Sequence, residues 1–199
     1  MRRREFTSLL GGAAVAWSVA ARAQQTERMR RIAILTFSAE NDQEGQSSIA
    51  AFRKEIGKLG WVEGRNCTID IRWAAADIEL MKKFARELVA LQPDLILTSS
   101  TPAAGVMLQT TRTIPIVFVI VADPVGSGFV VSLPRPGGNA TGFTPIVRSL
   151  GGKWVELLKE IAPQITRIAI LFNPPTATFI EGYLSSFKAA AAPLARRRL

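Results

Sequence analysis

At residues 94–110 the sequence is DLILTSSTPAAGVMLQT. Residues 94–98 form a short apolar run typical of a buried strand, and a polar turn leads from them into the helical stretch 102–110. Pro102 suits the first position of a helix, and Thr101 or Ser100 suits its N-cap. This stretch therefore predicts a buried strand joined by a tight turn to a helix, which is half of a βαβ unit.

The same alternation continues on both sides of this stretch. Between the strands, apolar residues recur every three or four positions, which predicts helices over 47–59 and 77–91. Ser47 or Ser48 is expected to cap the first helix and Asp77 the second. Short connections between alternating strands and helices predict an α/β fold with a doubly wound parallel sheet. The remaining strands are predicted at 31–37, 68–73 and 114–121.

Polar residues follow three of the predicted strands. In doubly wound sheets, ligands bind outside the carboxyl ends of the strands, near the point where the strand order reverses. We therefore expect a binding site where these strands end. Phe37 and Ser38 come after the first strand, with a polar loop at 39–46 that is long enough to reach over a crevice; Ser99, Ser100 and Thr101 come after the third; and Asp123 comes after the fourth.

Each of these groups has a binding interpretation and a purely structural one. The helix that begins near Pro102 presents unpaired backbone N–H groups and a positive dipole end, which suit a ligand carboxylate. Asp123 suits a ligand ammonium or hydroxyl group. Alternatively, the hydroxyl groups at 99–101 only cap the helix, and Asp123 only caps the turn that follows it.

Composition excludes several classes of function. The chain has no histidine, which excludes Ser-His and Cys-His nucleophile pairs and histidine-containing zinc sites. The only cysteine, Cys67, lies in a predicted strand and is expected to be a buried, inert thiol. Charged residues within 1–23 and 196–198 contribute +6 of the formal net charge of +9, and no basic stripe with interleaved aromatics lies between them. We expect no enzymatic activity, no cofactor, no metal and no nucleic-acid partner.

The amino-terminal residues have the order of an export signal. Arg2, Arg3 and Arg4 precede a mildly apolar run from Leu9 to Ala21, and an A-x-A cleavage site follows at 21–23. The arginine pair before Phe6 resembles the twin-arginine signal. We therefore expect residues 1–23 to be a signal peptide that is cleaved after Ala23, and the mature protein to be periplasmic.

A second, shorter region follows a predicted crossing at 145–148. We expect a helix with an apolar stripe of Trp154, Leu157, Leu158 and Ile161, a strand at 165–172 and a helix at 178–192. This predicts a first lobe at 24–147 and a partial second lobe at 148–199. One βα unit cannot cover both faces of a sheet, so we expect a truncated chain of low stability that binds ligand weakly or not at all.

Two stretches after the fourth strand carry a resemblance. DPVGSG at 123–128 and LPRPGGNATG at 133–142 resemble motifs of the ABC-transporter substrate-binding proteins, in the family that includes tryptophan- and tyrosine-binding members. GWVEGRN at 60–66 and IAILFNP at 168–174 are also similar to that family. The resemblance extends from the start of the mature chain to about residue 194.

The resemblance implies a periplasmic binding protein of type I fold, which closes two lobes over a small solute, possibly an amino acid, and delivers it to a membrane permease. It also implies that Asn173 of the second lobe joins the pocket. We expect the protein to act as a monomer. Two other classes of function stay open: a ligand-sensing module of a signalling receptor, and an α/β enzyme that uses carboxylates such as Asp123 and Glu156. A remnant of the transporter protein without function is a further alternative.

Overall fold

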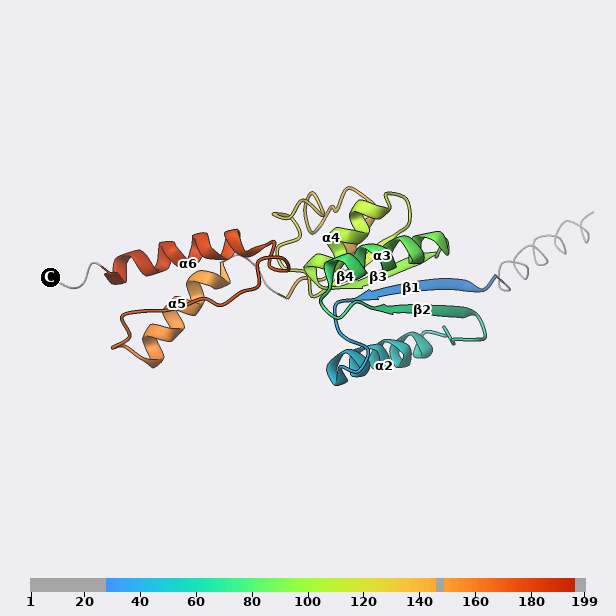
Figure 1. Cartoon of the computed structure of the whole chain (residues 1–199), viewed down its shortest axis with the longest axis horizontal. Helices are drawn as coiled ribbons and strands as arrows, with labels where there is room; N and C mark the ends of the chain where they lie inside the picture. Colours follow the sequence, from blue (N-terminus) through green and yellow to red (C-terminus); the bar gives the residue numbers. More distant parts are fainter. Residues whose placement is uncertain (1–27, 146–148, 196–199) are drawn as a thin grey trace, which may run out of the picture.

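The computed structural model describes residues 28–145 and 149–195 (Figure 1). Five parallel strands form one sheet in the order β2-β1-β3-β4-β5, so the chain winds outward from β1 in both directions. This confirms the predicted doubly wound α/β fold. The elements are β1 Arg30–Thr36, α2 Gln43–Lys58, β2 Cys67–Trp73, α3 Ile78–Ala90, β3 Leu95–Ser99, α4 Thr101–Thr110, β4 Ile116–Val119, β5 Ala140–Gly142, α5 Leu150–Ile161 and α6 Ile180–Ala195.

Helices lie on both faces of the sheet. Figure 1 shows α2 on one face and α3 and α4 on the other. The larger hydrophobic cluster fills the space under α3 and α4 and includes Leu35, Ile96, Met107 and Phe118, while Ile34 and Ile49 belong to a smaller cluster under α2. Successive side chains of a strand point to opposite faces, so the continuous apolar run of β1 contributes to both clusters.

Two strands differ from the prediction. The strand expected at 114–121 is shorter, because it spans only Ile116–Val119. The three-residue strand β5 was not predicted, and it pairs with β4 at the edge of the sheet. The sequence of β5, Ala-Thr-Gly, lacks the apolar run by which the other strands were found.

The helix caps explain where the helices begin. Asp77 caps α3 as predicted, since its carboxylate accepts hydrogen bonds from the N–H groups of Glu79 and Leu80. The prediction of Ser47 or Ser48 as the cap of α2 is wrong. Asp42 caps this helix instead, and its Oδ2 accepts from Gly45 N at 3.1 Å. The loop predicted at 39–46 is correspondingly shorter and ends at Asp42.

An ion-paired carboxylate fixes the start of the sheet. Asp94 Oδ2 accepts from the backbone N–H of Arg31 at 2.9 Å, and Asp94 Oδ1 accepts from Arg30 Nη1 at 2.7 Å. The hydrogen bond from Arg31 N, followed by that from the Arg30 side chain, lowers the pKa of Asp94 below its ordinary value. Asp94 therefore stabilises the folded chain while it is ionised.

We expect this contribution to depend on pH. The pKa of Asp94 is lower in the folded chain than in the unfolded chain, so its contribution is complete above the unfolded pKa of about 3.9 and is lost as the pH falls through the folded pKa. At pH 7, Asp94→Asn should lower the free energy of unfolding by about 1–2 kcal/mol. Urea titrations of both proteins at pH 7 and near pH 3 measure the difference, which should shrink in acid. An equal difference at both pH values would contradict this assignment.

The region after the sheet consists mainly of two helices packed on each other. Figure 1 shows α5 and α6 side by side. Their contact depends on Gly151, because a Cβ there would lie 2.5 Å from both Ser186 Oγ and the carbonyl oxygen of Tyr183. The rings of Trp154 and Tyr183 stack with their centroids 5.8 Å apart.

Two predictions for this region are wrong. The apolar stripe at Trp154, Leu157, Leu158 and Ile161 is exposed, and Gly151 and Val155 form the buried face of α5 instead. Residues 165–172 do not form a strand, and Leu171 is 99% exposed. A strand needs a neighbouring strand for its backbone hydrogen bonds, and none of the five described strands pairs with these residues.

The expected signal peptide, residues 1–23, lies outside the described residues. Within 28–145 and 149–195, no helix is both long enough and apolar enough to cross a membrane. Cys67 is buried at the start of β2, as predicted, and burial raises the pKa of its thiol.

Candidate functional site

The carboxyl ends of β1 and β3 bring two hydroxyl groups together. The strands are neighbours in the sheet, and Thr36 is the register partner of Ser99. Thr36 Oγ1 and Ser99 Oγ are 3.3 Å apart, and Thr36 Oγ1 also accepts from Ser38 N at 3.2 Å. Ser99 and Ser38 therefore meet at one edge of the sheet, as predicted, and Thr36 connects them.

The turn between β3 and α4 is tied to the end of β4. Ser100 N donates to the carbonyl oxygen of Val119 at 3.1 Å. Thr101 is 3% exposed, and its Oγ1 accepts from Ala122 N at 2.9 Å. These bonds hold the amino end of α4 beside the end of β4, so backbone N–H groups and the positive end of the helix dipole lie at the same edge of the sheet.

The predicted capping role of Ser100 is confirmed. Ser100 is the N-cap of α4, and its Oγ accepts from Ala103 N at 3.3 Å. Pro102 follows within the first turn, at a position that needs no N–H donor. Of the three predicted hydroxyl groups, those of Ser100 and Thr101 accept backbone hydrogen bonds, whereas that of Ser99 contacts only the hydroxyl of Thr36 among the described residues.

Phe37 and Ser38 are held by the turn that follows β2. The carbonyl oxygens of Phe37 and Ser38 accept from the N–H groups of Ala76 and Ala75, at 2.8 and 3.1 Å. The Phe37 side chain packs against the larger hydrophobic cluster. The side chain of Ser38 hydrogen-bonds to Asp42, which is the largest cause of the lowered pKa of that carboxyl group. Ser38 therefore supports the start of α2 as well as the end of β1.

Asp123 follows β4 and caps the next turn. Its Oδ1 accepts from Gly126 N at 3.1 Å, and its carbonyl oxygen accepts from Ser127 N at 2.9 Å. This is the structural alternative that the sequence offered for Asp123. Because the preceding residue, Ala122, is bonded to Thr101, the Asp123 turn adjoins the amino end of α4.

We call Thr36, Ser38, Ser99, Ser100, Thr101 and Asp123 the strand-end cluster. Among the predicted site residues, Phe37 and Asn173 are not part of this cluster. Asn173 is exposed in the connection between α5 and α6, and its carbonyl oxygen accepts from the N–H groups of Thr176 and Ala177.

The turns around the strand-end cluster contain strained backbone. Ser100 has a φ of 108°, Ile120 a φ of 56° and Asp123 a φ of 49°, and the turn after β2 places Ala75 and Ala76 at 47° and 60°. Positive φ costs roughly 1–3 kcal/mol for residues other than glycine, and such residues concentrate at binding sites and switch regions. Every predicted strand-end turn is therefore close to at least one such residue.

Sequence reasoning missed two residues of this region, Thr36 and Asp42. Thr36 was assigned to the strand, and its contact with Ser99 depends on how the two strands are aligned. The position of Thr36 as the last residue of an apolar run was the available signal, because parallel strands end at one edge of a sheet. Asp42 could have been found as an N-cap residue three positions before Gly45.

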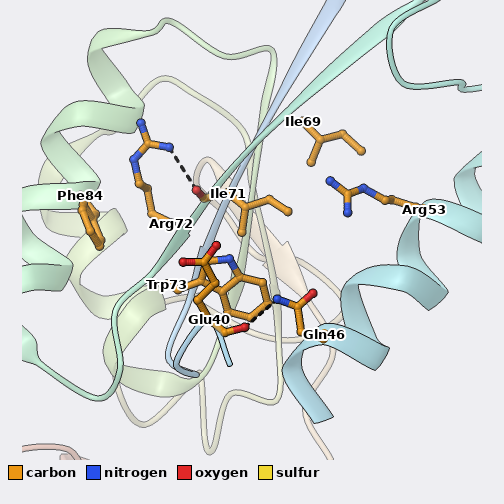
Figure 2. Close-up of a pocket in the computed structure, with 8 residues that line it drawn as sticks. All are labelled: Glu40, Gln46, Arg53, Ile69, Ile71, Arg72, Trp73 and Phe84. Atoms are coloured by element: carbon orange, nitrogen blue, oxygen red, sulfur yellow. Dashed lines mark hydrogen bonds between the residues drawn. The ribbon is translucent and has the colours of Figure 1, made fainter. Parts of the chain in front are cut away.

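A hollow of about 470 Å³ lies at the outer edge of β2 rather than within the strand-end cluster (Figure 2). It is lined by Glu40, Gln46, Arg53, Ile69, Ile71, Arg72, Trp73 and Phe84. None of the predicted site residues lines it. No group of three or more metal-ligating side chains occurs in the part of the chain that the structure describes.

Residues 38–192 match the family described as ABC transporter substrate binding protein. The chain belongs to this family. Its sequence is 34% identical over 122 residues to the tyrosine-binding protein of Clostridioides difficile (strain R20291), an alignment that covers 61% of this chain and 35% of that protein. The family is one of solute-binding proteins, which agrees with the expectation of binding without catalysis.

Two solved structures share the fold of this substrate-binding family member. A conserved domain protein from Vibrio cholerae superposes with a TM-score of 0.74 at 29% identity. The ABC domain in complex with L-Trp from Streptococcus pneumoniae superposes with a TM-score of 0.68 at 25% identity. Each alignment covers 84% of this chain and 55% of the other, so the chain spans about half the length of these relatives. The fold is like that of type I periplasmic binding proteins.

Proposed function

We propose that this chain is the substrate-binding component of an ABC importer and captures a small solute at the strand-end cluster. Family membership supports the function, and the hydrogen bond between Ala122 N and Thr101 Oγ1 is the observation that supports a site at this edge of the sheet. That bond joins the amino end of α4 to the turn after β4, so an anion-binding helix terminus and the Asp123 carboxylate lie on neighbouring turns.

The proposed ligand is an amino acid. Two of the relatives named above are a tyrosine-binding protein and a domain in complex with L-Trp. A zwitterion needs a positive potential for its carboxylate and an acceptor for its ammonium group; the positive end of the α4 dipole would serve the first and Asp123 the second. Ser38 and Ser99 would add hydroxyl groups, and Phe37 would add an aromatic edge. Asn173 would approach from a second lobe at 148–199 that faces the first lobe at 24–147.

Binding of this kind makes and breaks no covalent bond. A ligand that contacts two lobes favours their closed arrangement by the difference between its affinities for the closed and open states. Release to a membrane permease then follows from reopening, which a separate ATPase drives. Genes for a permease and an ATPase beside the gene for this chain would support transport, whereas a neighbouring sensor kinase would support a role in signalling.

A titration of the isotope-labelled chain with single amino acids, followed by backbone amide NMR, tests the proposed site. We expect weak binding of L-Trp, L-Tyr or L-Leu, because one set of strand ends contributes most of the contacts. The amide signals of Ser99, Ser100, Thr101 and Asp123 should shift together. No shift at these residues with any of the three amino acids would contradict the proposal.

Matched variants sharpen this test. Ser99→Ala removes the hydroxyl group that lies 3.3 Å from Thr36 Oγ1 and should weaken ligand binding about three- to tenfold, as expected for the loss of one hydrogen bond. Ser132→Ala removes a hydroxyl group from a loop between Val131 and Leu133 and should leave binding unchanged. Equal effects of the two variants would show that the ligand does not bind at the strand-end cluster.

We also propose that the protein is exported to the periplasm with cleavage after Ala23. The order of charges and apolar residues in 1–23 supports this. Mass spectrometry of the protein recovered from the periplasmic fraction of a bacterial host would detect the loss of these residues. Recovery of the uncleaved chain from the cytoplasm alone would contradict export.

A further inference from the structure

The outer edge of β2 has backbone groups available for pairing. Ala74 N donates to Thr36 O, and Arg30 N donates to Asn66 O, so the even-numbered residues of β2 direct their backbone groups toward β1. Backbone groups of successive strand residues point in opposite directions. Ile69, Ile71 and Trp73 therefore direct their N–H and C=O groups outward, and β2 pairs with no strand other than β1 among the described residues.

The apolar and the charged side chains of β2 lie on opposite faces of the sheet. Ile69, Ile71 and Trp73 lie on the α2 face with the smaller hydrophobic cluster. Arg72 lies on the opposite face, where its guanidinium is 6.0 Å from the centre of the Phe84 ring. Figure 2 shows Arg72 and Phe84 on one side of the strand and Ile69, Ile71 and Arg53 on the other, around the hollow that follows this edge.

We propose that this edge pairs with the same edge of a second copy of the chain, antiparallel and with Ile71 on the two-fold axis. In this register Ile71 faces the second copy's Ile71, and Ile69 faces its Trp73, in pairs that exchange backbone hydrogen bonds. Asp70 then lies directly opposite the second copy's Arg72, and the symmetry repeats this contact. Opposite charges and apolar side chains in such positions stabilise antiparallel strands.

Electrostatic interactions favour this register over the registers with the two-fold axis at Asp70 or Arg72. Outward-facing residues can pair only with outward-facing residues, so the two-fold axis must pass through a whole residue rather than between two. An axis at Asp70 would place the two Asp70 carboxylates opposite each other, and an axis at Arg72 would do the same with two guanidinium groups. Like charges directly opposite each other are destabilising. The axis at Ile71 alone turns both charges into attractive contacts.

Bonds that Arg72 already makes within its own chain compete with this pairing, so we expect a weak and reversible dimer. Arg72 Nη1 donates to the carbonyl oxygen of Ile71 at 3.0 Å, and Arg72 Nε lies 3.3 Å from Glu87 Oε2. Pairing requires Arg72 to release the Ile71 carbonyl and turn toward the second copy's Asp70. Asp70 already lies 3.4 Å from Arg31 Nε of its own chain, so its carboxylate would be shared between the two cations. The contact is short, and interfaces below about 1,200 Å² are typically transient. This dimer differs from the monomer expected from the sequence.

Sedimentation equilibrium of the purified chain, from about 10 µM to about 1 mM, tests the pairing over the range where weak dimers form. The wild-type chain should dimerise. Asp70→Arg and Arg72→Asp should each raise the dimer dissociation constant about tenfold or more, because each places like charges opposite each other. The double variant Asp70→Arg/Arg72→Asp exchanges the charges and should restore dimerisation. Lys188→Glu, on the exposed part of α6, is the control and should have no effect.

A cross-linking experiment keeps the test valid if a charge variant fails to fold. Ile71→Cys leaves the charges unchanged and places two thiols beside the axis, so mild oxidation should give a covalent dimer. Leu133→Cys places an exposed thiol in a loop and should give none. Wild-type chains that stay monomeric at the highest concentration, or a double variant that does not recover dimerisation, would overturn the proposed pairing.

Discussion

Gly142→Ala is expected to detach β5 from β4. A Cβ at position 142 would overlap the carbonyl oxygen of Phe118 and would lie 2.6 Å from Phe118 Cδ2, so one of the two strands must move. The hydrogen bond from Phe143 N to Phe118 O, at 2.9 Å, would be lost as well. We expect the free energy of unfolding to fall by about 1–3 kcal/mol, as for other overpacked sites. Urea denaturation followed by circular dichroism measures this loss.

Gly138→Ala is the matched control for this prediction. Gly138 lies in the loop just before β5, and a Cβ there would meet no atom within 4 Å. The control should change the free energy of unfolding by less than about 0.5 kcal/mol, as is usual for surface substitutions. If both alanine variants are equally stable, the close approach of β5 to Phe118 is not present in the folded protein.

Thr101→Val should produce a similar loss for a different reason. Valine has nearly the shape of threonine but no hydroxyl group, so the N–H of Ala122 would lose its acceptor in a buried position. A buried donor without a partner costs about 1–3 kcal/mol. The same change frees the turn after β4 from the amino end of α4. Thermal unfolding should show the loss of stability, and the amide signals of Ala122 and Asp123 should move in the NMR spectrum.

Thr98→Val should have the opposite effect on stability, although Thr98 lies only three residues before Thr101. Thr98 is fully buried between Leu35 and Phe118, and its Oγ1 has no hydrogen-bond partner among the described residues. Replacing an unsatisfied hydroxyl group with a methyl group of similar size should be neutral or stabilising. A destabilised Thr98→Val protein would show that the hydroxyl group is satisfied in solution, and the contrast with Thr101→Val would then disappear.

The sequence predicted those parts of the fold whose signals are local. The strand, cap and helix at 94–110 were correct because an apolar run, a capping serine and an early proline each determine structure over a few residues. The start of α2 was misplaced because its first turn contains no apolar residue, and the helical periodicity becomes visible only at Ile49. A polar cap at Asp42 therefore lies too far from the first apolar residue for the periodicity to indicate it.

Contacts between distant segments could not be predicted in the same way. The sequence placed Ser38, Ser99 and Asp123 at one edge of the sheet, but the pairing of Thr36 with Ser99 depends on strand alignment. The segment 165–172 has the composition of a strand and still lacks strand structure, because strand formation depends on a neighbour. The sequence predicts that the apolar stripe of α5 is buried, whereas Gly151 allows the close contact with α6 and Val155 is buried beside it on the same helix.

The positive-φ residues beside the strand-end cluster have a consequence for affinity. Hydrogen bonds within the chain hold Ser100 and Asp123 in their unfavourable conformations, so the free-energy cost of those conformations is met during folding. At the proposed site, a solute would meet donors and acceptors that are already oriented and would lose little of its binding energy to ordering the protein. Discrimination among solutes would then depend on how well each one fits a fixed arrangement.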